Sequence, residues 1–279
     1  MTDGTGPGGP PGSALLVAAF RGWNDAADSA SDALAHLAEA WDAEVVHEVD
    51  PEPYYDFQVN RPEAVLGEDG SRELVWPGTR VLRAEVDGRV VVLVDGTEPS
   101  MRWRGFCAEL LRVAQEHGVQ RVFTLAALLT DVPHTRPIPV SVTTQEPARA
   151  AAWGLELSTY EGPTGIVGVL QHEAAAAGLP GVSMWAAVPH YVAQPPNPKS
   201  TLALLGRLED LTGLASPVGE LREEADAWQL GVDELAGEDE EIAEYVSQLE
   251  QARDTADLPE ASGEAIAREF EKYLRRRER

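Results

Sequence analysis

Unbroken apolar runs alternate along this chain with stretches in which apolar residues recur every three or four positions. The runs at 14–20 (ALLVAAF), 89–95 (RVVVLVD) and 119–125 are typical of strands buried on both faces of a sheet. Helical spacing follows the first run over Ala26–Trp41, and another helical stripe begins at Trp103. Strands that alternate with helices predict an α/β fold with a largely parallel sheet.

The second half of the body continues this alternation. We expect a helix over Ile166–Ala177, a short strand over Val182–Ala187 and an amphipathic helix over Lys199–Thr212. Near the start, Glu44–Val49 is expected to be a strand that completes a β-loop-α-β unit of the parallel sheet. Residues 51–87 show no sustained period, so we expect loops and short strands there.

The chain changes character after about residue 216. Residues 220–264 contain sixteen acidic residues and two basic ones, yet apolar residues keep helical spacing around Trp228 and Tyr245 and again around Phe270. We therefore predict three parts: a disordered Gly/Pro tail (1–13), an α/β core domain (14–216) and an acidic helical appendage (217–279). The basic residues near the end complement a helix dipole.

Charge and cysteine usage exclude some classes of function. The 279 residues carry a formal net charge of −25, which argues against nucleic-acid and membrane-surface partners because both need clustered positive charge. No stretch is long and apolar enough for a membrane span. The single cysteine, Cys107, cannot form an internal disulfide and is expected to be a buried small hydrophobe. These features predict a cytoplasmic protein without a signal peptide.

Polar residues gather in the loops that follow the predicted strands. In an open α/β sheet these loops meet at one edge, where ligands bind. We therefore expect a ligand crevice formed by residues from five loops: Asn24, Asp25, Glu98, Arg102, His134, Arg136, Thr164, Gly165, His190 and Tyr191.

Each of these residues also has a purely structural explanation. Asn24 or Asp25 can cap the helix that follows, and Glu98 can serve as first-turn charge. His190 beside Tyr191 is more often a packed pair than a ligand. The sequence contains neither a phosphate-binding glycine motif nor a histidine spacing typical of a metal site, and no nucleophile–base pair is visible. We expect no cofactor and no metal, and catalytic residues stay unassigned.

Several segments together resemble the proteasome assembly chaperone 2 family, and most closely its long actinobacterial branch. The resemblance covers roughly residues 14–214 and rests on segments that occur in the family's order: FRGWNDA, DGTEPSMRW, LLTDVPHTRPIPV, TGIVGVLQHEAAAAGLP and WAAVPHYVAQPPNPKSTLALLGRLEDLTG. It implies a nucleoside-phosphorylase-like sandwich with a mixed sheet, homo-oligomers and, in some relatives, a chaperone or scaffold role for proteasome subunits. Family members that act on proteasomes can end in a hydrophobic–Tyr–any tripeptide. This sequence ends Arg-Glu-Arg with Tyr273 further inward, which argues against direct docking into proteasome pockets.

Two functions follow from these observations. The favoured one is a non-enzymatic assembly chaperone or scaffold that acts through homo-oligomerisation and protein contacts. The alternative is a nucleoside phosphorylase- or hydrolase-like enzyme, in which Asp25, Glu98, His134 and Arg136 would supply acid, base and clamp. Aromatic residues outside the periodic segments favour subunit contacts and a trimer as first expectation: Trp23, Tyr54, Tyr55, Phe57, Trp76, Trp103 and Trp153.

Overall fold

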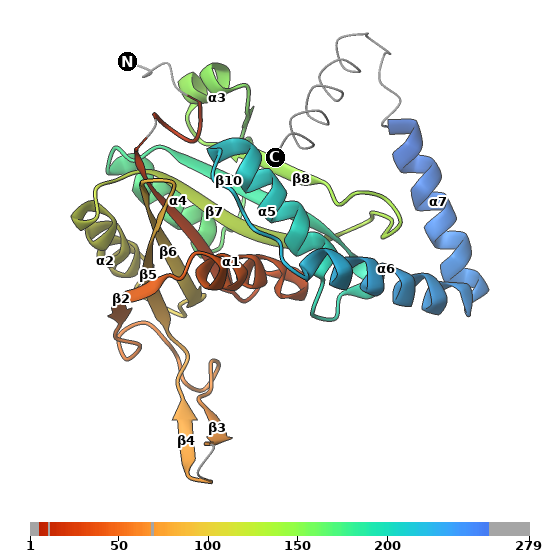
Figure 1. Ribbon diagram of the computed structural model, residues 1–279, viewed down its shortest axis with the longest axis horizontal. Helices are drawn as coiled ribbons and strands as arrows, with labels where there is room; N and C mark the ends of the chain where they lie inside the picture. The colour runs from red at the N-terminus through yellow and green to blue at the C-terminus, as the bar shows by residue number, and fades with distance from the viewer. Residues whose placement is uncertain (1–5, 11, 68–69, 257–279) are drawn as a thin grey trace.

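An eight-stranded sheet forms the centre of the molecule in the computed structural model, which describes residues 6–10, 12–67 and 70–256 (Figure 1). The strand order is β2-β5-β6-β1-β7-β10-β8-β9. The four central strands β6, β1, β7 and β10 are parallel, and antiparallel pairs flank them on both sides. The expected α/β class with a mixed, largely parallel sheet is confirmed. The strands of the sheet are β1 (Ala14–Arg21), β2 (Glu44–Val49), β5 (Thr79–Val86), β6 (Arg89–Thr97), β7 (Val119–Thr130), β8 (Val140–Thr144), β9 (Glu156–Leu157) and β10 (Gly181–Pro189).

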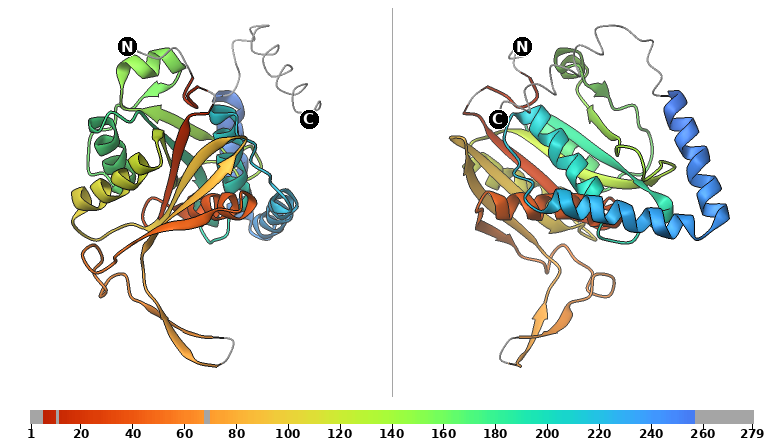
Figure 2. Two further views of the ribbon diagram at one scale, coloured as in Figure 1. Left: turned by 60° about the vertical axis from the view of Figure 1, so that its left-hand side comes forward. Right: turned by 45° about the vertical axis from the view of Figure 1, so that its right-hand side comes forward.

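Helices cover both faces of this sheet (Figures 1 and 2). One core layer contains α1 (Ser29–Ala40) and α5 (Pro198–Thr212), and the other contains α2 (Trp103–Glu116) and α4 (Ile166–Ala176). Alternate residues of β1 enter the two layers, with Leu15 in the first and Leu16 in the second, both fully buried. A strand buried on both faces must be apolar throughout, which explains the unbroken run at residues 14–20.

The second predicted strand lies elsewhere than expected. β2 has the predicted bounds, but it pairs antiparallel with β5 at the edge of the sheet and does not extend the parallel part next to β1. Its partner β5 is an eight-residue strand inside the region where sequence pattern predicted only loops and short strands. β5 is buried on parts of both faces, since Val81, Leu82 and Ala84 are buried while Arg80 and Glu85 are exposed.

The described part of the N-terminal tail is packed, which differs from the disorder expected for residues 1–13. The buried guanidinium of Arg89 donates hydrogen bonds to the carbonyl oxygens of Gly8, Ser13 (3.1 Å) and Thr212 (2.9 Å). The sequence of the tail did not predict this because the donor lies about 80 residues away along the chain. Arg89 thereby holds the start of the body against the end of α5.

A two-stranded hairpin projects from the body (Figures 1 and 2). Its strands are β3 (Glu63–Leu66) and β4 (Arg72–Val75), and every residue of both is exposed. We call this hairpin, with the flanking residues Phe57–Val59 and Trp76, the arm. At its base Phe57 and Trp76 pack edge to face with ring centroids 4.8 Å apart.

Two acidic helices follow the body. α6 (Leu221–Gly237) packs against α5, and α7 (Glu240–Ala256) follows α6 and turns away from it (Figure 1). Ala225 and Val232 of α6 and Val246 of α7 are buried, while most acidic side chains of both helices face solvent. The expected third helix around Phe270 lies outside the described residues. A domain boundary near residue 216 stays a prediction.

Short helical segments complete the described chain. They are η1 (Ala26–Asp28), α3 (Pro147–Trp153) and η2 (His190–Val192). Within the described residues, no helix is long and apolar enough to cross a membrane.

Candidate functional site

The structure gathers most of the predicted site residues in two groups at the carboxyl ends of the central strands. The first group surrounds the N-terminus of α4 and contains Asn24, Asp25, Glu98, Thr164 and Gly165. The second lies under α6 and α7 and contains His134, Arg136, His190 and Tyr191. Arg102 immediately precedes α2 in the left-handed conformation (φ 55°), is exposed, and acts electrostatically on Tyr54.

Glu98 joins two loops of the first group. Its Oε1 atom accepts a hydrogen bond of 2.8 Å from the backbone N–H of Ile166, the first residue of α4. A carboxylate at this position satisfies an otherwise free helix N–H and interacts favourably with the positive end of the helix dipole. A Cβ at Gly165 would lie 2.9 Å from the same Oε1 and 3.5 Å from Oδ1 of Asn24, so a larger residue there would require the Glu98 side chain to shift.

Asn24 and Asp25 lie directly after β1 and are both buried. Asn24 Nδ2 donates to the carbonyl of Phe20 at 2.6 Å, whereas its Oδ1 has no hydrogen-bond partner among the described residues. Asp25 Oδ1 accepts from the backbone N–H groups of Ala30 (2.7 Å) and Ser31 (3.3 Å) at the start of α1. Burial raises the pKa of Asp25 to about 6, against the opposing effect of these hydrogen bonds.

His134 is at the centre of the second group and is almost completely buried. The hydroxyl of Tyr191 accepts from the backbone N–H of His134 and lies 2.7 Å from its Nδ1, while Nε2 lies 2.9 Å from Asp233 Oδ1 of α6. Lys199 Nζ donates to the carbonyl of His134 and to Gln229 of α6. Burial lowers the pKa of His134 more than the neighbouring Asp233 raises it. These contacts attach α6 to the body.

The remaining residues of this group contact α7. Arg136 forms a two-pronged ion pair with Asp254 (2.9 and 2.8 Å) and a further one with Glu250 (3.0 Å). His190 lies 3.2 Å from Asp131 and packs edge to face against Tyr245 of α7. The acidic helices thus cover residues that the sequence pattern placed in an open crevice, so the predicted single crevice is divided.

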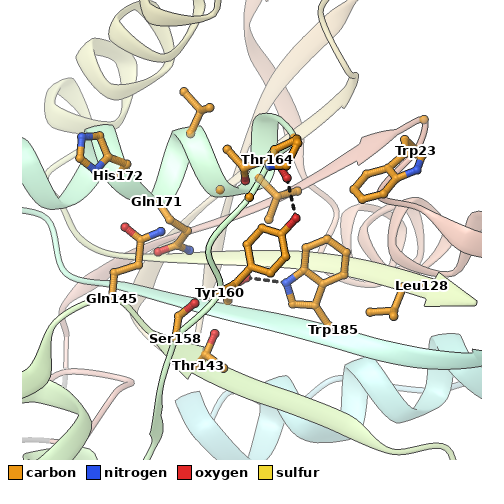
Figure 3. A pocket seen from close by; sticks show the side chains of 18 of the residues that line it. Trp23, Leu128, Thr143, Gln145, Ser158, Tyr160, Thr164, Gln171, His172 and Trp185 are labelled. Carbon is orange, nitrogen blue, oxygen red and sulfur yellow. Dashed lines mark hydrogen bonds between the residues drawn. The ribbon is translucent and has the colours of Figure 1, made fainter. Parts of the chain in front are cut away.

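A pocket of about 1170 Å³ lies beside the first group (Figure 3). Of the predicted site residues, Thr164 and Gly165 line it. The other principal lining residues were missed by sequence reasoning: Trp23, Thr143, Gln145, Ser158, Tyr160, Gln171, Ser183 and Trp185. Trp185 and Ser183 lie on β10, where their apolar and small neighbours predicted only a buried strand. The signal in the sequence was the position of Tyr160 next to the turn-forming pair Gly162-Pro163.

Neither group contains an arrangement typical of a catalytic or metal centre. Asp25 and Glu98 are engaged at helix N-termini, and His134 and Arg136 are held by α6 and α7. Across residues 6–10, 12–67 and 70–256, no cluster of three or more His, Cys, Asp or Glu side chains is arranged to hold a metal ion. The chemistry that this end of the sheet offers is hydrogen bonding, aromatic contact and ion pairing.

Comparison with known proteins gives a consistent result. The sequence model of the PAC2 family matches residues 19–236. A PAC2 family protein from Streptomyces avermitilis is 58% identical, with a TM-score of 0.78 over 84% of this chain and 100% of that one. A proteasome-assembly chaperone homologue from Mycobacterium tuberculosis is 51% identical, with a TM-score of 0.76 over 83% of this chain and 99% of that one.

More distant structures share the fold. A Pyrococcus furiosus protein described as an archaeal proteasome activator is 16% identical, with a TM-score of 0.61 over 81% of this chain and 95% of that one. At this identity the likeness concerns the fold alone. No functionally curated protein matches the chain.

Proposed function

Because the chain belongs to the PAC2 family, we propose that it is a non-enzymatic assembly chaperone or scaffold that works as a homo-oligomer and binds other proteins. The relative from Mycobacterium tuberculosis is described as a proteasome-assembly chaperone homologue, which supports proteasome subunits as the partners. A cytoplasmic location is part of this proposal and is supported by the lone, buried Cys107, which leaves no internal disulfide.

The observation that carries the proposal is the exposed apolar surface of the arm. Val59 and Leu66 are each 74% exposed, Leu74 57% and Trp76 47%. A two-stranded hairpin without a third strand or a covering helix is marginally stable in water. Apolar side chains that project together from a soluble body are typical of a protein–protein contact. The arm is therefore expected to be stabilised by a neighbouring subunit.

A second copy of the chain is the simplest partner for the arm. If the arm of each subunit binds the body of the next, the contact joins two different surfaces and closes into a ring when the rotation permits. A trimer is the smallest such ring. Of the aromatic residues considered for subunit contacts, Trp76 and Trp23 are exposed, whereas Tyr55 is buried and its hydroxyl bonds within the body to Thr79 and Thr97.

The comparisons do not support the alternative of a nucleoside phosphorylase- or hydrolase-like enzyme. The four residues named for that chemistry, Asp25, Glu98, His134 and Arg136, are divided between the two groups and engaged in contacts within the protein. General acid–base catalysis needs such groups within hydrogen-bond reach of one substrate. Assembly through surfaces makes no such demand.

Light scattering coupled to size exclusion tests the oligomer. We expect the natural chain to elute as a multiple of its 30.1 kDa mass and the double variant Leu66→Ser/Leu74→Ser to elute near 30.1 kDa. The matched control is Leu230→Ser, which removes a leucine of α6 that is 65% exposed and should leave the mass unchanged. A natural chain that is monomeric at micromolar concentration would contradict the proposal.

The chaperone activity needs its own measurement. Purified proteasome α and β subunits from the same organism are mixed with and without the protein, and the yield of assembled particles is followed on native gels. We expect faster or more complete assembly with the natural chain than with the Leu66→Ser/Leu74→Ser variant. An unchanged yield, together with no retention of proteasome subunits on the immobilised protein, would exclude these subunits as partners.

A further inference from the structure

The pocket beside α4 has the size and lining of a small-molecule site. It lies between α4, the ends of β7, β8 and β10, and the segment from Ser158 to Gly165 (Figure 3). Its volume of about 1170 Å³ is slightly above the range of roughly 300–1,000 Å³ that is usual for such sites. The contacts that attach α6 and α7 to the body involve residues that do not line this pocket. Of the aromatic residues considered for subunit contacts, only Trp23 also lines it.

Two aromatic rings in the pocket have their polar atoms already bonded within the protein. The indole N–H of Trp185 donates to Ser183 Oγ at 3.0 Å, and Thr124 Oγ1 donates to the same oxygen at 3.3 Å. The hydroxyl of Tyr160 donates to the carbonyl of Pro163 at 2.8 Å. The rings are thereby fixed in position, and their faces and edges are what they offer to a ligand. Fixed aromatic faces bind flat rings by stacking.

A third aromatic residue, Trp23, also lines the pocket, and most of its side chain is exposed to solvent. Trp23 is 77% exposed and Tyr160 is 68% exposed. Figure 3 shows Trp23 and Leu128 on one side of Tyr160 and Trp185, and Gln145 and Ser158 on the other. Large aromatic side chains left open to water around a pocket gain free energy when a flat apolar surface covers them.

The polar part of the lining is mostly neutral. Gln145, Ser158 and Thr143 provide amide and hydroxyl groups that can both donate and accept hydrogen bonds. Among the described lining residues, the groups with a full charge at neutral pH are Arg104 and Glu173, which are of opposite sign. The chain as a whole carries −25, which disfavours anionic ligands at its surface.

We propose that this pocket binds an uncharged, nucleoside-sized molecule composed of a planar heteroaromatic ring and a hydrogen-bonding substituent. The ring stacks against Trp185, Tyr160 and Trp23. The substituent extends toward Gln145, Ser158 and Thr143, where its hydroxyl or amide groups exchange hydrogen bonds with these side chains. The pocket exceeds the volume of a single ring, which is why both parts belong to the ligand.

Isothermal titration calorimetry of the full chain with adenosine tests this inference, with AMP and tetramethylammonium as comparison probes. We expect saturable binding of adenosine, weaker binding of AMP because of its phosphate, and none of tetramethylammonium. Trp23→Ala and Tyr160→Ala alter exposed side chains, so the fold should tolerate them. Each is expected to weaken adenosine binding by about tenfold or more. The matched control, Leu235→Ala, truncates an exposed side chain of α6 that does not line the pocket and should leave the affinity unchanged.

Every other outcome overturns the inference. No binding of adenosine, or binding that both pocket variants leave intact, would show that the aromatic faces are not a ring site. Binding of tetramethylammonium that is lost in Trp23→Ala, without binding of adenosine, would identify a cation site instead. Tighter binding of AMP than of adenosine would show that the ligand class is anionic.

Discussion

Asp25 shows how a single buried carboxylate can both organise and destabilise its surroundings. It follows β1, and its Oδ1 accepts from the N–H groups of Ala30 and Ser31, which would otherwise be unsatisfied at the start of α1. Between them the chain turns through Ala27 and Asp28, both in the left-handed conformation at φ 53° and 54°. The same burial that makes the cap effective raises its pKa to about 6. The ionised form is therefore held at a cost in free energy.

We expect Asp25→Asn to stabilise the protein near neutral pH. The folded pKa lies above the unfolded value of 3.8, so the folded state binds more protons between about pH 4 and 6. Stability therefore falls as pH rises through this window and stays low above it. An asparagine retains the acceptor without the charge and should raise the free energy of unfolding by about 1–3 kcal/mol at neutral pH.

Urea unfolding at about pH 4, 5, 6 and 7.5 measures this effect. The contribution of Asp25 to the fall in stability between pH 4 and 6 should disappear in Asp25→Asn. Asp25→Ala is the control, because it removes both the charge and the acceptor and should be less stable than Asp25→Asn by about 1 kcal/mol. Equal stability of the two variants would show that the cap contributes nothing.

At the scale of helices and strands, the attachment of α6 and α7 to the body depends on one buried histidine. The carboxylate of Asp233 can only accept, so a neutral His134 ring carries its proton on Nε2, and Nδ1 accepts from the hydroxyl of Tyr191. The groups that act on His134 are Asp233 of α6, Lys199 of α5 and Glu250 of α7. The net result is a lowered pKa, with burial as its main cause.

We expect acidification to loosen α6 and α7. Because the folded pKa of His134 lies below the unfolded value of 6.5, the unfolded state binds more protons just below pH 6.5, and stability falls as pH decreases through that range. Hydrogen exchange over residues 221–256 should be faster at about pH 5.5 than at 7.5, relative to the exchange of β1. The variant His134→Gln should lose most of this difference. If it keeps the full difference, the acidic side chains of the two helices are the cause.

The sequence predicted those elements whose pattern is local and missed those that depend on distant partners. The bounds of β1, α2 and α4 follow directly from apolar spacing, because each of these segments contains its own continuous or helically spaced set of buried apolar residues. β5 was not predicted, since charged residues such as Arg83 interrupt its apolar residues and leave neither an alternating nor a continuous apolar pattern. The covering of His134 could not be predicted either: Asp233 lies 99 residues further along the chain, and no local pattern relates the two.

The pocket could likewise be predicted only in part, because most of its lining comes together from separate segments of the chain. Thr164 and Gly165 were found because strand-end loops meet at one edge of an α/β sheet. Trp185 was not, because alternate residues of a strand differ in environment and a buried-strand pattern does not reveal which faces a cavity. Its indole N–H donates to Ser183 of the same strand, and Ser183 in turn accepts from Thr124 of β7, a contact between neighbouring strands that only the three-dimensional arrangement shows.

For the whole molecule, charge sets the conditions under which subunits can meet. Each chain carries −25, so copies repel one another at low ionic strength. The screening length is about 30 Å at 0.01 M salt and about 8 Å at 0.15 M. The contact proposed for the arm is apolar and should lose little in salt, which leaves the relief of repulsion as the dominant effect.

We therefore expect association to strengthen with salt. Analytical ultracentrifugation at about 10 and 150 mM NaCl should show a larger oligomeric fraction at the higher concentration. Leu66→Ser/Leu74→Ser should remain monomeric in both, which separates the effect on the contact from any general effect on solubility. An oligomer that dissociates as salt rises would mean that ion pairs, rather than the apolar residues of the arm, hold the subunits together.

The position of β1 in the sheet has a consequence for folding during synthesis on the ribosome. β1 is the first strand to be made, yet it lies in the middle of the sheet, between β6 and β7, which end at Thr97 and Thr130. At about 5–20 residues per second, roughly 5–20 seconds of synthesis separate the end of β1 from the end of β7. The segment ALLVAAF has neither of its strand neighbours until β6 has been made, and it still lacks β7 until the end of that interval. The nascent chain thus exposes the most apolar strand of the future core until more than a third of the protein has followed it.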